Sequence, residues 1–138
     1  MKASAWLGLA ALASGCGGGE TTAACVQGLD LSCAPLYWPT FDQVYTRTLK
    51  PSCAISGASC HASEGAMGGL VFADEGSSYA LLLGQNGSKA QIIPGDAACS
   101  PLIERLHATD TTVMPPGAPL ADAERCAIAQ WIQNGAKQ

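Results

Sequence analysis

The residues that decide the fold run Phe41-Asp-Gln-Val-Tyr-Thr-Arg-Thr-Leu-Lys-Pro-Ser-Cys-Ala-Ile-Ser-Gly-Ala-Ser-Cys-His61. In the first half of this stretch, apolar side chains recur at helical spacing, at Phe41, Val44, Tyr45 and Leu49. Thr40 is a residue type that caps helix N-termini, and Pro51 lacks the N–H that a continuing helix needs. The stretch therefore predicts a helix that begins at Phe41 and ends at Pro51, followed by a loop that leads to Cys60 and His61.

The remainder of the chain alternates short helical patterns with loops that contain glycine or proline. One helix is expected after a cap at Ser77 or Ser78, one from the Ser100 cap and Pro101, and one over residues 121–134. Their apolar positions include Leu81, Leu82, Leu102, Ile103, Leu106, Ile128, Trp131 and Ile132. The pattern predicts an all-α fold, a small bundle of four or five short helices with long loops and little or no sheet.

The N-terminus has the pattern of an export signal. Lys2 precedes an apolar run over residues 3–13, which is too short to span a membrane as a helix. Ala13-Ser14-Gly15-Cys16 resembles a bacterial lipobox. We expect a signal peptide at 1–15, a lipidated Cys16 with a tether over 16–39, and one domain over 40–136. The alternative is an ordinary signal peptide with an incidental cysteine.

Composition narrows the class of protein. The chain has 138 residues, a formal charge of −4, 48% hydrophobic residues and 13% charged residues. This length allows one domain, and the few basic residues argue against a nucleic-acid binder. The apolar content argues against a wholly disordered chain. Seven cysteines in an exported protein indicate covalent cross-links.

The dipeptide Cys60-His61 carries the most chemical information. In c-type haem attachment a cysteine thiol adds to a haem vinyl group, and the adjacent histidine ligates the iron. A second cysteine usually stands three residues earlier, where this chain has Gly57. We therefore expect Cys60 to attach haem c and His61 to be the proximal ligand. The nearest upstream thiol is Cys53, which we expect to be the second attachment, at a spacing longer than usual.

Met114 supplies a candidate for the opposite side of the iron. A thioether is a soft ligand suited to haem iron, and the prolines at 115 and 116 stiffen the loop that presents it. Met67 and His107 are weaker candidates. The structural alternatives are that Met114 fills the core and that Cys53 and Cys60 form a disulfide beside an exposed His61. A zinc site is disfavoured because the paired ligands of zinc modules are missing, and no separate base supports nucleophilic catalysis by Cys60.

Several motifs in order resemble the small cytochrome c domains of exported bacterial proteins. They are residues 41–53, Ser59-Cys60-His61, Gly68-Gly69-Leu70, Ile93-Pro94-Gly95-Asp96, Ser100-Pro101-Leu102-Ile103, Met114-Pro115-Pro116-Gly117 and Ile128 to Ala136. The resemblance covers about residues 40–136. It implies that the first helix packs across the last, with Phe41, Tyr45 and Trp131 at the crossing. It also implies that Cys60, His61 and Met114 hold the haem, with Cys53 at a displaced position.

Four cysteines lie outside that haem pattern. We expect disulfides Cys99–Cys126 and Cys25–Cys33, each closing a short loop.

The expected function is electron transfer rather than enzymatic catalysis. The expected protein is a haem-binding c-type cytochrome, lipid-anchored on the periplasmic side, in the outer membrane, with a redox protein as partner. The alternative is a haem-free, disulfide-stapled lipoprotein that serves as a structural or interaction module. The sequence leaves the potential, the partner and the oligomeric state open.

Overall fold

The computed structural model describes residues 25–56 and 60–138. The expected signal peptide, Cys16 and the first part of the tether lie outside the described residues. In the described part the structure has helices and no strand. The helices are α1 (Phe41–Val44), η1 (Tyr45–Cys53), η2 (Met67–Gly69), α2 (Glu75–Leu82), α3 (Pro101–His107) and α4 (Asp122–Gln133). The expected all-α, disulfide-stapled architecture is confirmed.

The first helix continues further than expected. α1 passes directly into η1, a π-helical segment that includes Pro51 and ends at Cys53. The Ala54 N–H donates to the Leu49 carbonyl, five residues earlier, at 2.8 Å. This wider hydrogen-bond pattern carries the helix past a residue that cannot donate, so the prediction of an end at Pro51 was wrong. The longer helix brings Cys53 to its last turn.

Two of the expected caps act differently. α2 begins at Glu75 because the Asp74 carboxylate accepts from the Ser77 N–H at 2.9 Å, so the predicted cap at Ser77 or Ser78 was wrong. α3 does begin after Ser100, with Pro101 in its first turn. The buried Ser100 hydroxyl, however, accepts from the Ile93 N–H and donates to the Asp96 carbonyl, both at 2.8 Å. It fixes the turn before α3 instead of capping the helix.

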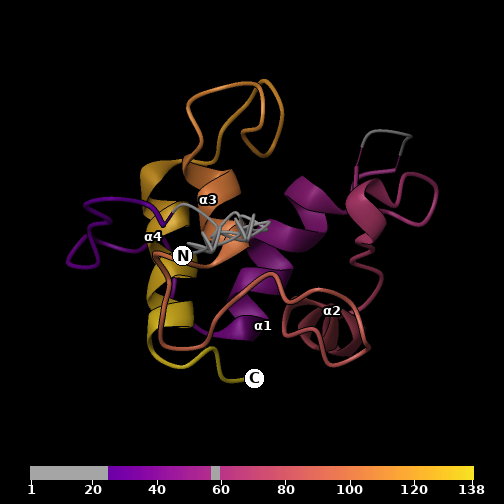
Figure 1. Ribbon diagram of the computed structural model, residues 1–138, viewed down its shortest axis with the longest axis horizontal. Helices are drawn as coiled ribbons and strands as arrows, with labels where there is room; N and C mark the ends of the chain where they lie inside the picture. Colours follow the sequence, from indigo (N-terminus) through magenta and orange to yellow (C-terminus); the bar gives the residue numbers. More distant parts are fainter. Residues whose placement is uncertain (1–24, 57–59) are drawn as a thin grey trace, which may run out of the picture.

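The core lies where α1 meets α4. The Phe41 ring lies 5.1 Å from the Trp131 ring and 5.1 Å from the Tyr79 ring of α2. Phe41 and Trp131 are almost fully buried. Figure 1 shows the arrangement: α4 and α3 lie on one side of α1, and α2 lies on the other. The first and last helices therefore pack aromatic against aromatic, as expected for Phe41 and Trp131.

The disulfides join other partners than expected. The bonds are Cys25–Cys99 and Cys33–Cys126, so the predicted pairs Cys25–Cys33 and Cys99–Cys126 were wrong. The reason is the course of residues 25–37, which lie beside α4 (Figure 1). The Val26 N–H donates to the Ala98 carbonyl, and the Gln130 side chain donates to the carbonyls of residues 31 and 33.

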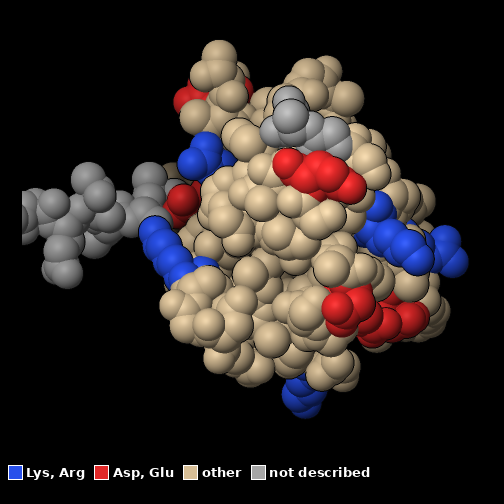
Figure 2. Space-filling view, turned by 90° about the vertical axis from the view of Figure 1, so that its right-hand side faces the viewer, with Lys and Arg blue, Asp and Glu red and all other residues tan. Residues whose placement is uncertain are grey.

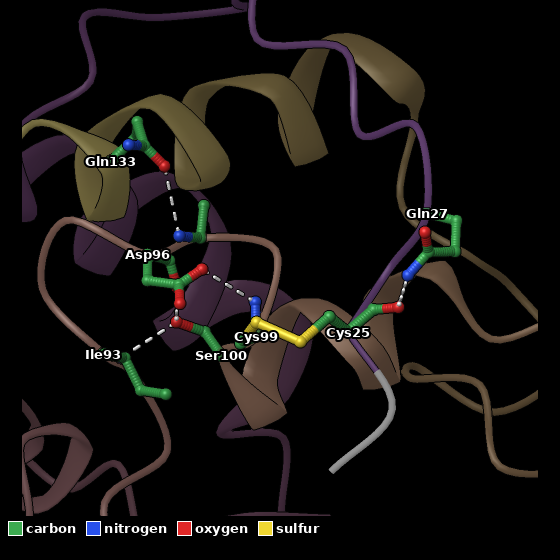
Figure 3. Close-up of a disulfide and its surroundings, with 8 residues drawn as sticks. Cys25, Gln27, Ile93, Asp96, Cys99, Ser100 and Gln133 are labelled. Atoms are coloured by element: carbon green, nitrogen blue, oxygen red, sulfur yellow. Dashed lines mark hydrogen bonds between the residues drawn. A yellow bond between two sulfur atoms is a disulfide. The ribbon is translucent and has the colours of Figure 1, made fainter. Parts of the chain in front are cut away.

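The turn that receives Cys25 is well held. The Cys99 N–H donates to the Asp96 carboxylate at 3.1 Å, and the Gln133 side chain of α4 accepts from the Ala97 N–H at 3.2 Å (Figure 3). In the chain-entropy picture each bond constrains a long loop in the unfolded state, over 74 and 93 residues. The two bonds fasten the N-terminal segment to the turn before α3 and to α4.

The surface has no dominant charged patch on the face seen in Figure 2. Acidic and basic side chains lie there in small separate groups on a largely uncharged surface. Among the described residues, none of the helices combines the length and apolarity required to cross a bilayer.

Candidate functional site

A largely apolar cavity of about 420 Å³ collects the chemically interesting side chains. It lies between η1, the segment over 60–72, α3 and the Met114 loop. Its apolar lining is Leu49, Leu70, Phe72, Leu82, Leu102, Leu106, Pro115 and Pro116, and its other lining side chains include Cys53, Cys60, His61, Met67, Gln91, Arg105 and Met114. The size and lining are those of a small-molecule or cofactor pocket.

The structure brings Cys53 beside Cys60 and His61 in spite of their spacing. The His61 N–H donates to the Cys53 carbonyl at 3.0 Å, which brings the backbones of these two residues together. The Phe72 N–H donates to the His61 carbonyl at 2.8 Å and fixes the other side of the same backbone. All three expected residues of this group therefore line one cavity.

Cys53 and Cys60 are both free thiols in the structure. Burial raises the pKa of the Cys53 thiol to about 12, and the nearby Glu124 and Cys60 add to the increase. The alternative of a Cys53–Cys60 disulfide is a matter for the mass of the purified protein, because the structure contains no bond between these two thiols.

The His61 ring has a buried nitrogen, Nδ1, without a hydrogen-bond partner among the described residues. The ring lies 5.4 Å from the Phe72 ring, which holds it against the cavity wall. An unsatisfied buried polar atom is costly, and it is a common sign of a missing water or ligand.

Met114 lies in the cavity wall formed by its loop. Its N–H donates to the Arg105 carbonyl at 2.9 Å, which ties the loop to the last turn of α3. Met67 also lines the cavity, but its N–H donates to the Cys60 carbonyl at 3.3 Å, so its backbone belongs to the Cys60 side. His107 does not line the cavity. The structure thus groups Met114 with His61 and leaves His107 elsewhere.

Arg105 is a cavity residue that the sequence analysis missed. It is the one charged side chain in the lining, and it extends from the same face of α3 as Leu102 and Leu106. Among the described residues it makes no ion pair, and its one hydrogen bond runs from Nη1 to the Thr112 carbonyl at 3.5 Å. The sequence held no distinctive signal for this role, because arginine is a common residue on the exposed face of a helix.

The donor set fits a haem. An imidazole and a thioether are the side chains that ligate iron in His/Met sites, and two thiols line the same cavity. Apolar walls exclude water, and one guanidinium is placed to bind a carboxylate. In the described part of the chain, no three His, Cys, Asp or Glu side chains gather as they would around a protein-ligated ion.

Comparison with known proteins agrees with this reading of the cavity. A family described as Planctomycete cytochrome C matches residues 58–117, which is less than half of the chain. Neither the curated proteins nor the solved structures contain a match. The matched segment contains Cys60, His61, Arg105 and Met114, and it supports a cytochrome c-like domain in this protein.

Proposed function

We propose that this protein is a c-type cytochrome that carries single electrons and performs no enzymatic catalysis. The observation that carries the proposal is the meeting of Cys53, Cys60, His61 and Met114 in one apolar cavity. When bound, haem c supplies one-electron exchange between two oxidation states of iron. The residues of this chain hold, ligate and enclose it.

Each lining residue has a defined task in this proposal. Cys60 provides the covalent attachment next to His61, which is the proximal ligand, and Cys53 is the second attachment. Met114 is the distal ligand, and its tie to Arg105 limits the movement of its loop. The apolar lining would keep water from the iron, and Arg105 would bind a haem carboxylate through its unpaired N–H groups.

The proposed cellular location of the protein rests on sequence features outside the cavity. The export signal and the lipobox-like residues before Cys16 support a lipoprotein on the periplasmic side, and we place it in the outer membrane. Residues 16–24 are the tether. The expected tether over 16–39 is too long, because disulfides bind Cys25 and Cys33 to the domain, which we place over residues 25–136. The partner is another redox protein. The proposal includes no nucleic acid.

The decisive experiment is the intact mass of the mature protein made with cytochrome c maturation machinery. We expect the added mass of one haem together with the lipid, and a haem that survives acid–acetone extraction. Colourless protein that carries only disulfides would refute the proposal and leave the haem-free interaction module. Cys60→Ser is expected to abolish covalent haem, whereas Cys53→Ser is expected to leave one thioether.

Met114→Ala tests the distal ligand. The covalent haem is expected to remain, the reduction potential to fall, and carbon monoxide to bind the reduced iron, because the thioether would no longer ligate the iron. Met67→Ala is the matched control, since Met67 lines the same cavity from the Cys60 side. Unchanged carbon monoxide binding in Met114→Ala would show that the distal assignment is wrong.

A further inference from the structure

A second hollow, of about 450 Å³, opens on the outer side of the N-terminal segment. It is lined by Pro35, Leu36, Tyr37, Trp38, Gln43 and Arg47, and it shares no residue with the haem cavity. Trp38 is 81% exposed and Leu36 is 60% exposed. Two large apolar side chains so close together on a surface indicate a contact site.

These side chains are presented by a rigid frame. The Leu36 N–H donates to the Ala123 carbonyl at 2.8 Å, and the Tyr37 hydroxyl bonds to the buried Thr48 hydroxyl at 2.6 Å. The disulfide Cys33–Cys126 fastens the chain three residues before Leu36. The exposure of Trp38 is therefore a feature of the folded domain and not of a loose end.

We propose that Leu36 and Trp38 dock on the surface of a lipid bilayer, with Arg47 facing the phosphate groups of the lipids. Tryptophan and leucine insert at the boundary of headgroups and acyl chains, and a neighbouring arginine binds phosphate. This inference rests on the lipid anchor of the proposed function, and it adds a second membrane contact to that anchor.

The length of the tether is what selects a bilayer as the occupant. Nine peptide steps separate Cys16 from Cys25, so a lipid on Cys16 keeps Cys25 within about 30 Å of the membrane. Cys25 is bonded to Cys99, and the segment that leaves it leads directly to Leu36 and Trp38. The exposed apolar pair thus belongs to the same stapled segment that the anchor holds at the membrane. Docking there uses no residue of the haem cavity, which stays available to a redox partner.

The test uses the holoprotein over residues 16–138 with Cys16→Ser, exported behind a different signal peptide that is fully removed. Flotation with vesicles of equimolar phosphatidylethanolamine and phosphatidylglycerol measures binding without the anchor. The chain is expected to float with the vesicles, and Trp38→Ala is expected to reduce the partition coefficient about tenfold. Ile93→Ala is the matched control, because Ile93 is an exposed apolar residue outside the hollow.

The outcomes separate this inference from the proposed function. Haem content is read from the same preparations, so absence of haem refutes the cytochrome while flotation still reports on the membrane contact. Equal flotation of the Trp38→Ala and Ile93→Ala variants would overturn the docking surface. It would also be overturned if Trp38→Ala changed only the concentration-dependent sedimentation of the protein in lipid-free buffer, since the hollow would then join two copies of the chain.

Discussion

The double substitution Cys33→Ala/Cys126→Ala tests the covalent frame around the cavity. In the structure this change leaves Cys25–Cys99 intact. With that bond in place, the shortest closed path through Cys33–Cys126 contains the nine residues from 25 to 33 and the 28 residues from 99 to 126. A closed loop of this length corresponds to about 3.8 kcal/mol of chain entropy at 25 °C. We expect the free energy of unfolding to fall by roughly that amount, a large share of a total of about 5–15 kcal/mol.

Two measurements check this prediction. Urea unfolding of the variant and the wild type gives the difference in free energy, and thiol titration under denaturing conditions counts free cysteines. The variant is expected to gain no free thiol, because Cys25 and Cys99 remain bonded to each other. If the bonds instead joined Cys25 to Cys33 and Cys99 to Cys126, the same variant would gain two thiols. That count, or a loss of stability below about 1 kcal/mol, would refute the reasoning.

Three further predictions concern single side chains. Arg105→Gln in the haem-loaded protein is expected to lower the reduction potential, because a positive charge in the haem cavity is lost. The expected decrease is about 59 mV, which corresponds to a tenfold shift toward the oxidised iron, and voltammetry measures this decrease. Thr48→Val is expected to cost about 1–3 kcal/mol in urea unfolding, because the buried hydroxyl joins a tyrosine and a glutamate; the exposed Thr46→Val should cost much less. Gly84→Ala is expected to lower the melting temperature more than Gly87→Ala. Both glycines have positive φ, but only at 84 would a Cβ lie 2.8 Å from a backbone carbonyl oxygen; equal losses would contradict this.

The helical pattern was largely readable from local sequence. Apolar spacing, the Ser100-Pro101 start and the last amphipathic stretch all correspond to helices of the structure. Errors arose where local rules compete. Pro51 usually ends a helix, but a π-helical pattern carried this one to Cys53, and Asp74 outcompeted the serines as a cap because its carboxylate accepts from the Ser77 N–H.

The candidate site was readable only in part. Cys60, His61 and Met114 could be named because their chemistry is specific, and all three line the cavity. The position of Cys53 could not be judged from its spacing, because the hydrogen bond from the His61 N–H to the Cys53 carbonyl joins residues that no local pattern pairs. Arg105 was missed because an exposed arginine on a helix has no distinctive local signature.

The sequence by itself determined the class of the fold and the kinds of side chain available for chemistry, because helix periodicity and ligand chemistry are properties of short segments. Only the tertiary structure decided the disulfide partners, since the bonds Cys25–Cys99 and Cys33–Cys126 depend on residues 25–37 lying beside α4. It likewise decided that Arg105 faces the cavity and that Trp38 faces solvent. These features arise from contacts between residues far apart in the chain, and no local pattern encodes them.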